Sequence, residues 1–145
     1  MVERYETFTV LINRISRNIR KIKNQEMADY QLRSAHISCL YYLYTLEHVT
    51  ATELCERCEE DKATISRALD YLETNGYLHC ESKSTKRYKT PILLTEKGVE
   101  AGKRISEKID YVLDVISDCL TEEERVAFYR SLTLISDSLG ALVQE

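Results

Sequence analysis

The chain of 145 residues is long enough for one domain with a dimerisation extension, and its 43% hydrophobic content suffices for a packed core. The formal net charge of −4, with 30% charged residues, is ordinary for a soluble protein. No apolar run approaches the roughly 18 residues that a membrane-spanning helix needs, and the polar N-terminus carries no secretory signal. Five irregularly spaced cysteines do not resemble a disulfide framework, so we expect a cytoplasmic protein.

The charge is unevenly distributed along the chain. Residues 99–145 carry ten acidic and five basic side chains, whereas residues 83–89 carry four basic side chains and no acid. Phosphate binding depends on local charge, while net charge mainly affects solubility and steering. The acidic total therefore does not exclude nucleic acid as a partner.

Residues 5–29 are expected to form a long amphipathic helix, because apolar side chains recur at helical spacing from Tyr5 to Ile22. A helix this long has more apolar surface than a small domain covers, so we expect it to contact a second copy of the chain. Its opposite side carries five Lys and Arg residues, which form a solvated face or a secondary DNA contact.

Two shorter helices are expected next. The first spans residues 34–47, with Ser34 as a candidate N-cap. Thr50 and Glu53 match the capping box, which would begin a short helix that ends near Cys58 and packs through Leu54. A three-residue turn then leads into the next segment.

The segment Asp61–Gly76 (DKATISRALDYLETNG) is expected to form one helix with two different faces. Asp61 is the candidate N-cap, and Gly76 is the candidate left-handed stop. Apolar residues at three- and four-residue spacing predict a buried face: Ile65, Ala68, Leu69 and Leu72. The other face bears cations and short hydroxyls, which bind phosphates and base edges: Lys62, Thr64, Ser66 and Arg67. An ordinary surface helix has a similar pattern, but a short helix and a tight turn before it indicate a helix-turn-helix.

After Gly76 the pattern changes to two short strands, 77–82 and 88–94, joined by a basic loop. Pro91 restricts the second strand to an edge or to irregular pairing. A hairpin directly after a helix-turn-helix is a wing. Its tip, with Lys86 and Arg87, is the part expected to reach a minor groove.

Two long helices complete the chain. Thr95 is expected to cap a helix that runs to about Leu120, and Thr121 with Glu124 forms a second capping box for the last helix. Both helices carry extended apolar stripes. Amphipathic helices at both ends of a winged core favour a dimer built from the two termini.

The chain resembles the MarR family of bacterial transcriptional regulators in helix order and length over almost all of its residues. The most specific segments are Asp61–Leu78 (DKATISRALDYLETNGYL) and Leu93–Gly98 (LLTEKG). The resemblance implies a mainly α (α+β) fold, with a winged helix-turn-helix core and long N- and C-terminal helices that form a dimerisation region. It divides the chain into an N-terminal dimerisation helix (1–33), a DNA-binding domain (34–98) and C-terminal dimerisation helices (99–145).

The resemblance also implies a homodimer on a pseudo-palindromic operator in double-stranded DNA, with one helix in the major groove and the wing in the minor groove. Family members commonly repress transcription and are released by small phenolic or other ligands, metals or oxidants. The wing departs from the family pattern, because Ser84–Tyr88 lacks the acid that braces the arginine in the usual Asp-x-Arg tip. The expected DNA contacts are Lys62, Thr64, Ser66 and Arg67 in the major groove, Ser34 and Thr50 at helix N-termini, and Lys86 and Arg87 in the minor groove.

Tyr41 and Tyr44 are candidate ligand contacts, because in this family the second helix borders the ligand crevice. Tyrosine at such positions is also ordinary half-buried core. Cys55 and Cys58 form a CxxC pair without the second pair that a zinc site usually needs, so burial as small apolar residues, a redox role and a metal role stay open.

The three histidines are scattered, and no Gly-rich phosphate loop is present. We therefore expect no enzyme, no cofactor and no metal site. The predicted function is a dimeric, sequence-specific DNA-binding transcriptional regulator, a repressor released by a small molecule or another signal. The alternative is a winged-helix dimer that serves as a protein-interaction module without specific DNA binding.

Overall fold

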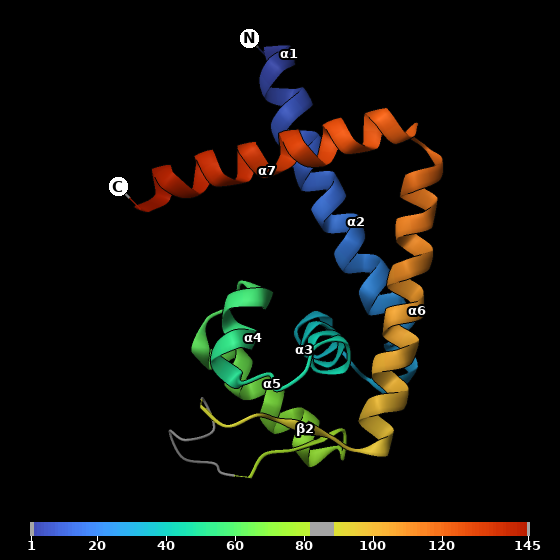
Figure 1. Cartoon of the computed structure of the whole chain (residues 1–145), viewed down its shortest axis with the longest axis vertical. Helices are drawn as coiled ribbons and strands as arrows, with labels where there is room; N and C mark the ends of the chain where they lie inside the picture. The colour runs from blue at the N-terminus through green and yellow to red at the C-terminus, as the bar shows by residue number, and fades with distance from the viewer. Residues whose placement is uncertain (1, 82–88, 145) are drawn as a thin grey trace. The chain divides into compact units, whose positions relative to one another are not determined.

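A computed structural model of the chain describes residues 2–81 and 89–144 (Figure 1). It divides into two compact units, Met1–Glu107 and Lys108–Glu145. The expected mainly α fold with a small wing is confirmed, since the sheet in the described residues is a two-stranded antiparallel one. In chain order the elements are α1 (Val2–Tyr5), η1 (Glu6–Val10), α2 (Leu11–Glu26), η2 (Ala28–Tyr30), α3 (Ser34–Thr45), α4 (Ala51–Cys58), α5 (Lys62–Thr74), β1 (Leu78–His79), β2 (Leu93–Leu94), α6 (Glu96–Asp118) and α7 (Glu122–Gln144).

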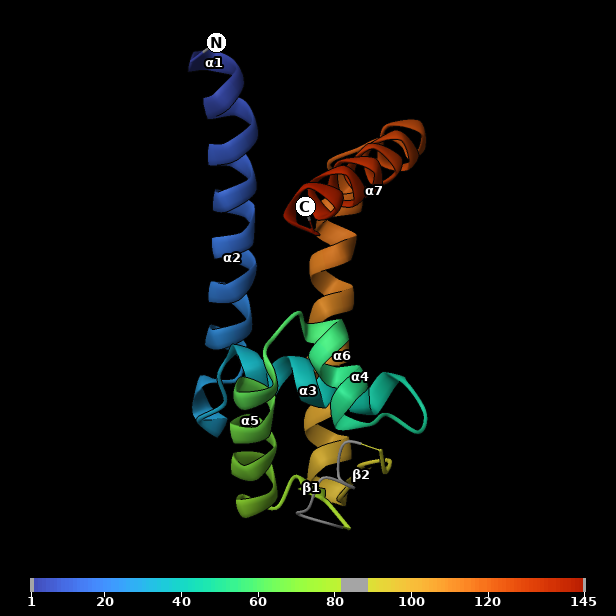
Figure 2. The same cartoon turned by 90° about the vertical axis from the view of Figure 1, so that its left-hand side faces the viewer.

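The N-terminal helical segment is a continuous rod formed by α1, the π-helical turn η1 and α2 (Figure 2). It begins at Val2 and ends at Glu26, before the expected end near residue 29, because Met27 leaves the helix and becomes completely buried. Every side chain from Leu11 to Lys21 is exposed in the single chain. The side chain of Tyr5 lies outside the described part.

The core of the first unit surrounds α3, which packs against α2, α4 and α5. Figure 1 shows α3 almost end-on beside α4 and α5. The buried side chains of this core come from α3, α4 and α5 and from connecting segments such as the one between α2 and α3. The largest are Met27, Leu32, Ile37, Leu40, Leu54, Ile65, Leu69 and Leu72.

The start of α3 differs from the expectation. Ser34 is the first helical residue rather than the N-cap, which is Arg33. The backbone N–H of Arg33 donates to Nδ1 of His36 at 3.0 Å, so the imidazole does what Glu does in a capping box. The helix also ends two residues early, at Thr45, because Leu46 is extended and His48 has a positive φ of 56°.

The caps of the helix-turn-helix are confirmed. Thr50 Oγ1 accepts the N–H of Glu53 at 3.3 Å at the start of α4. Asp61 Oδ1 accepts the N–H of Thr64 at 2.7 Å at the start of α5. The four apolar residues expected on the inner face of α5 are all buried. Gly76 follows the helix with φ of 78°, as expected for the left-handed stop.

The wing strands are shorter than expected in the described residues. Leu78 pairs with Leu94, and His79 pairs with Leu93. Beyond them the backbone donors have other partners: the N–H of Cys80 donates to the Glu73 carboxylate at 2.7 Å, and the N–H of Ile92 donates to the Val49 carbonyl at 3.0 Å. Pro91 has no N–H to contribute. The two-residue ladder therefore ends where other groups take its hydrogen bonds.

The beginning of α6 is joined closely to the end of α5. Thr95 caps α6 by accepting the N–H of Gly98 at 3.1 Å, as expected. Lys97 Nζ donates to the Asn75 carbonyl at 2.7 Å and lies 4.3 Å from the centre of the Tyr77 ring. Gly98 is required here, because a Cβ at this position would collide with the Tyr77 carbonyl oxygen.

The second unit contains the last turns of α6 and all of α7. The expected capping box is confirmed: Thr121 N–H donates to Glu124 at 2.8 Å, and Glu124 N–H donates to Thr121 Oγ1 at 3.2 Å. By length and composition alone, α7 could cross a membrane, with a mean hydropathy of 1.2, although the sequence pattern had predicted no apolar run of this length. A single such helix is weak evidence, and Arg130 and Asp137 interrupt its apolar stretch.

Candidate nucleic-acid interface

The outward face of α5 is polar and opposite to its buried face. Lys62 and Arg67 are exposed and Ser66 is half-buried, while Ile65 on the inner side has no exposed surface. Asp70 is also exposed one turn further on, a residue that the sequence analysis did not place on this face. The cations are therefore concentrated in the first two turns, nearest the positive end of the helix dipole.

Two consecutive hydrogen bonds between neighbouring residues fix the start of this face. Asp61 accepts the N–H of Thr64 at 2.7 Å, and Arg67 Nη2 donates to Thr64 Oγ1 at 3.4 Å. The Thr64 N–H and hydroxyl, with a smaller contribution from Arg67, hold the pKa of Asp61 below its ordinary value. Thr64 is half-buried, so it connects the cap to the arginine. We call these three residues the Asp61–Thr64–Arg67 chain.

The other two expected backbone contacts lie at the starts of neighbouring helices. Ser34 is the first residue of α3 and is half-buried. Thr50 precedes α4, and its oxygen accepts the N–H of Glu53. A hydroxyl that accepts this bond still has its own proton to donate to a phosphate. Contact of Ser34 and Thr50 with DNA stays a prediction.

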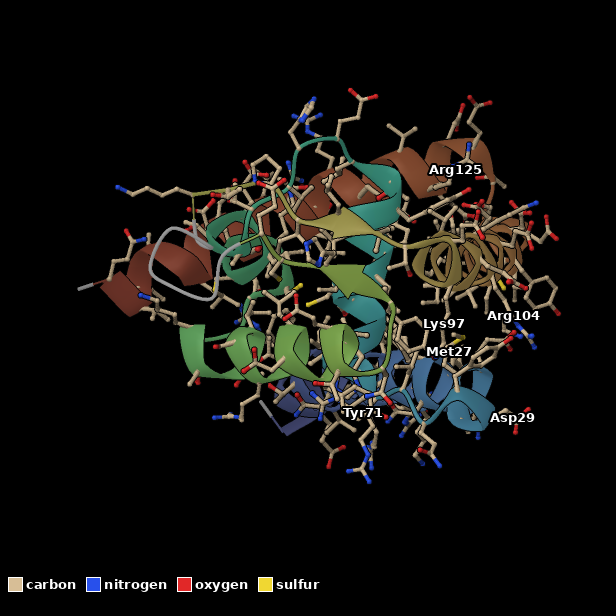
Figure 3. The ribbon with its side chains drawn as sticks, turned by 90° about the horizontal axis from the view of Figure 1, so that it is seen from below. Met27, Asp29, Tyr71, Lys97, Arg104 and Arg125 are labelled. Carbon is tan, nitrogen blue, oxygen red and sulfur yellow. The ribbon has the colours of Figure 1, made fainter. Side chains whose placement is uncertain are left out.

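The base of the wing packs against α5 through β1, and Figure 3 shows β1 and β2 side by side. Lys86 and Arg87 at the tip lie outside the described residues. Their predicted entry into the minor groove is therefore a statement about the sequence alone.

Comparison with known proteins identifies this arrangement. Residues 30–87, from the end of η2 into the wing, match the model of the MarR family. The helix-turn-helix segment of the chain is therefore similar to that of the MarR family.

Similar proteins match the chain over most of its length. An HTH-type transcriptional regulator of Bacillus cereus (strain ATCC 14579) is 29% identical over 123 residues, which cover 84% of this chain and 82% of that protein. The crystal structure of the S. aureus MepR–DNA complex has a TM-score of 0.80 at 22% identity, covering 91% and 97% of the two chains. Staphylococcus aureus MarR in complex with salicylate and kanamycin has a TM-score of 0.78 at 16% identity, covering 95% and 93%. These two structures have the same fold as this chain.

The candidate ligand contacts Tyr41 and Tyr44 have packing roles in the structure. Tyr41 meets Tyr42 edge to face, with ring centres 5.2 Å apart. Tyr44 is 37% exposed and packs against α6. A Cβ added at Gly102 of α6 would lie 2.5 Å from the Cβ of Tyr44. The structure thus accounts for Tyr44 by packing, and ligand contact by either residue stays a prediction.

Two tertiary contacts that position the helices of the interface were not predicted from the sequence. The His36 ring stacks on the ring of Tyr71, with ring centres 4.3 Å apart, and the Tyr71 hydroxyl donates to the Gln31 carbonyl at 2.9 Å. Figure 3 labels Tyr71. Burial, with a smaller effect of the Arg33 cation, lowers the pKa of His36. This contact fixes the start of α3 against α5, and no local pattern predicts it because the rings are far apart in the sequence.

The second contact joins α6 to the end of the N-terminal rod. Arg104 donates to the Tyr30 hydroxyl at 2.9 Å and lies 3.8 Å from the Glu26 carboxylate (Figure 3).

The described residues contain no candidate group of metal ligands. In residues 2–81 and 89–144, no three His, Cys, Asp or Glu residues lie close enough together to hold a metal ion.

Proposed function

We propose that the protein is a sequence-specific DNA-binding regulator of transcription that inserts α5 into the major groove. The observation that carries this proposal is the outward polar face of α5, whose arginine is held by the Asp61–Thr64–Arg67 chain. Arg67 would bind a base edge, and Lys62 and Ser66 would bind base edges or phosphates. The MepR–DNA complex, which shares this fold, supports DNA as the partner.

The protein acts as a homodimer in this proposal. Large apolar side chains are exposed along the rod and along α7 in the single chain, among them Phe8, Ile15, Phe128 and Leu139. Such surfaces are covered in a stable protein. Segments 1–33 and 99–145 would then form the dimer, and 34–98 would bind DNA, with two recognition helices about 34 Å apart, one turn of DNA.

The regulator is a repressor that a small molecule releases, and it acts in the cytoplasm. Repression follows the family pattern, in which the dimer occupies a pseudo-palindromic operator. The S. aureus MarR complex with salicylate and kanamycin supports a small-molecule effector. Tyr41 and Tyr44 on α3 are the proposed ligand contacts, because both rings keep exposed or half-exposed edges.

The test begins with the protein's own choice of DNA. Selection from a randomised duplex library should enrich a pseudo-palindrome with half-sites about 10 base pairs apart. On that duplex, fluorescence anisotropy over a salt series should show specific binding, with a slope of about −0.9 per neutralised phosphate.

Variants separate base reading from phosphate binding. Arg67→Ala should lose about 1–3 kcal/mol of preference for the selected duplex over a scrambled one. Arg87→Ala should weaken binding to both duplexes similarly and reduce the salt slope by about one. Lys103→Ala removes an exposed cation of α6 and is the matched control. If the library yields no enriched sequence and Arg67→Ala changes nothing, the fold serves protein contact instead.

A further inference from the structure

The segment Met27–Leu32, which we call the rod turn, joins the rod to α3 and is held by its own backbone. The N–H groups of Tyr30 and Leu32 donate to the Met27 carbonyl at 3.1 and 3.3 Å. Met27 and Leu32, at the two ends of the turn, are buried in the core, and Gln31 between them has a φ of 57°. The Gln31 carbonyl is therefore fixed in place relative to the end of the rod.

Tyr71 joins α5 to the rod turn. Its hydroxyl donates to the Gln31 carbonyl at 2.9 Å, although the two residues are 40 positions apart in the sequence. Its ring stacks on the ring of His36 of α3, with ring centres 4.3 Å apart and planes 15° apart. The His36 ring is itself held, because it accepts the Arg33 N–H. Tyr71 therefore connects α5 to both the rod turn and α3.

The rod turn is also fixed to α6. Arg104 of α6 donates to the Tyr30 hydroxyl at 2.9 Å and lies 3.8 Å from the Glu26 carboxylate at the end of the rod. The rod and α6 belong to the two segments of the proposed dimer, 1–33 and 99–145. Both are thus joined to the rod turn, and Tyr71 makes a hydrogen bond to this turn from α5.

Apolar packing by itself defines the direction of α5 less sharply. The buried face from Ile65 to Leu72 holds the helix against the core, but hydrophobic contact is non-directional, whereas a hydrogen bond requires a narrow range of distance and angle. Lys62 lies nine residues before Tyr71, or about 13 Å along the helix. A rotation of about 10° around Tyr71 would move the start of α5 by about 2 Å, enough to break a hydrogen bond to a base.

We propose that Tyr71 is a positioning residue that fixes the direction of α5 relative to the rod and thereby sets the half-site spacing that the dimer accepts. The first part concerns the single chain and is independent of DNA. The second part rests on the proposed function, because two α5 helices must reach half-sites about 34 Å apart at once. One inserted base pair rotates a half-site by about 35° and moves it by about 3.4 Å, so a firmly held α5 loses its contacts there.

The test variant is Tyr71→Phe, which removes the hydroxyl and keeps the ring that stacks on His36. The matched control is Tyr42→Phe, which removes a hydroxyl from α3 and keeps a ring that meets Tyr41 edge to face. Thermal melts verify that both variants are folded. Fluorescence anisotropy then measures each protein on the selected duplex and on duplexes with one base pair inserted or deleted between the half-sites.

We expect the parent chain and Tyr42→Phe to bind the altered duplexes at least about tenfold more weakly than the selected one. For Tyr71→Phe this ratio should fall to about threefold or less, with weaker binding to the selected duplex, because a loosely held α5 adapts to a changed spacing but loses more conformational freedom on binding. A purely structural role of the hydroxyl would instead lower the affinity for all three duplexes equally and leave the ratio unchanged.

A distance measurement tests the single chain without DNA. Genetically encoded spin labels replace Asn18 on the rod and Thr74 on α5, both of which are exposed. Dilution with unlabelled protein isolates the distances within one chain. Double electron–electron resonance should give the same narrow distance distribution for the parent chain and Tyr42→Phe, and a broader one for Tyr71→Phe.

Three results would count against the proposal. An unchanged distance distribution for Tyr71→Phe, or equal broadening by both variants, would overturn the positioning role. A broader distribution with an unchanged spacing ratio would reject the effect on half-sites. If the parent chain prefers no DNA sequence, the proposed function fails, while the distance distribution still decides whether Tyr71 positions α5.

Discussion

Thr95, just before α6, donates a hydrogen bond of 2.6 Å to the carbonyl oxygen of Gly76, which lies two residues after the end of α5. The N–H of Thr95 also donates to the Tyr77 carbonyl at 3.1 Å. Lys97 Nζ donates to the Asn75 carbonyl. The LLTEKG segment therefore donates hydrogen bonds to the backbone carbonyl groups that follow α5. This segment thus connects the end of α5 to the start of α6.

Removing the Thr95 hydroxyl should weaken this connection. Thr95→Val loses the α6 cap and the bond to Gly76, so we expect about 1–2 kcal/mol less stability in urea unfolding. Thr133→Val is the control, because that hydroxyl bonds only within its own helix, to the Tyr129 carbonyl at 2.9 Å. It should change stability by less than about 0.5 kcal/mol. Equal losses for the two variants would contradict the connection.

Adding one methyl group should distinguish two glycines. In Gly98→Ala the new Cβ meets the Tyr77 carbonyl, and we expect a loss of about 1–3 kcal/mol from overpacking. In Gly140→Ala on α7 the Cβ meets nothing within 4 Å. That change should stabilise the protein by about 0.5–1 kcal/mol, because alanine favours a helix interior over glycine. Thermal melts of both variants test this, and a stabilised Gly98→Ala would disprove the close approach.

Stability should depend on pH through His36. Its folded pKa is lowered, chiefly by burial, so the unfolded chain binds more protons between the folded pKa and about 6.5. Stability is therefore lost as the pH falls from about 6.5 through the folded pKa. His36→Gln can still accept the Arg33 N–H but does not titrate, and should flatten this part of a urea-unfolding series. His79→Gln, an exposed control, should not.

The dimer should depend on the apolar stripe of the rod. Ile15 is 49% exposed in the single chain, and Ile15→Glu would place an unpaired charge in the proposed interface. We expect the dimer dissociation constant to rise at least about 100-fold, equivalent to roughly 3 kcal/mol. Asn18→Glu adds the same charge to another exposed position of α2 and should leave the dimer intact. Sedimentation velocity measures both, and an unaffected Ile15→Glu dimer would place the interface elsewhere.

The Asp61–Thr64–Arg67 chain should matter for DNA more than for folding. Thr64→Val removes the hydroxyl that Arg67 donates to, so we expect a three- to tenfold lower affinity for the selected duplex, or about 1 kcal/mol. Thr64→Ser keeps the hydroxyl and should restore most of the affinity. If serine and valine bind alike, Arg67 does not depend on this contact.

Local interactions made much of this fold predictable from the sequence. The capping pairs Thr50–Glu53 and Thr121–Glu124 lie three residues apart, and helix geometry brings such residues together whatever surrounds them. The buried face of α5 follows from its spacing for the same reason. Ser34 is the exception, because it is not the N-cap that its sequence position predicted. His36, two residues later, accepts the Arg33 N–H instead, and histidine is not among the residues that capping rules include.

Contacts between distant residues were decided by the tertiary structure. The wing ladder ends where Glu73 binds the Cys80 N–H and Val49 binds that of Ile92, and neither partner belongs to the hairpin. His36 meets Tyr71 because the packing of α3 against α5 brings these side chains together. The sequence by itself determined the helices, the caps of α4, α5, α6 and α7 and the polar face of α5, since these depend on residues within one helical turn. Only the packed core decided which rings and backbone groups pair, since those pairs join segments far apart in the chain.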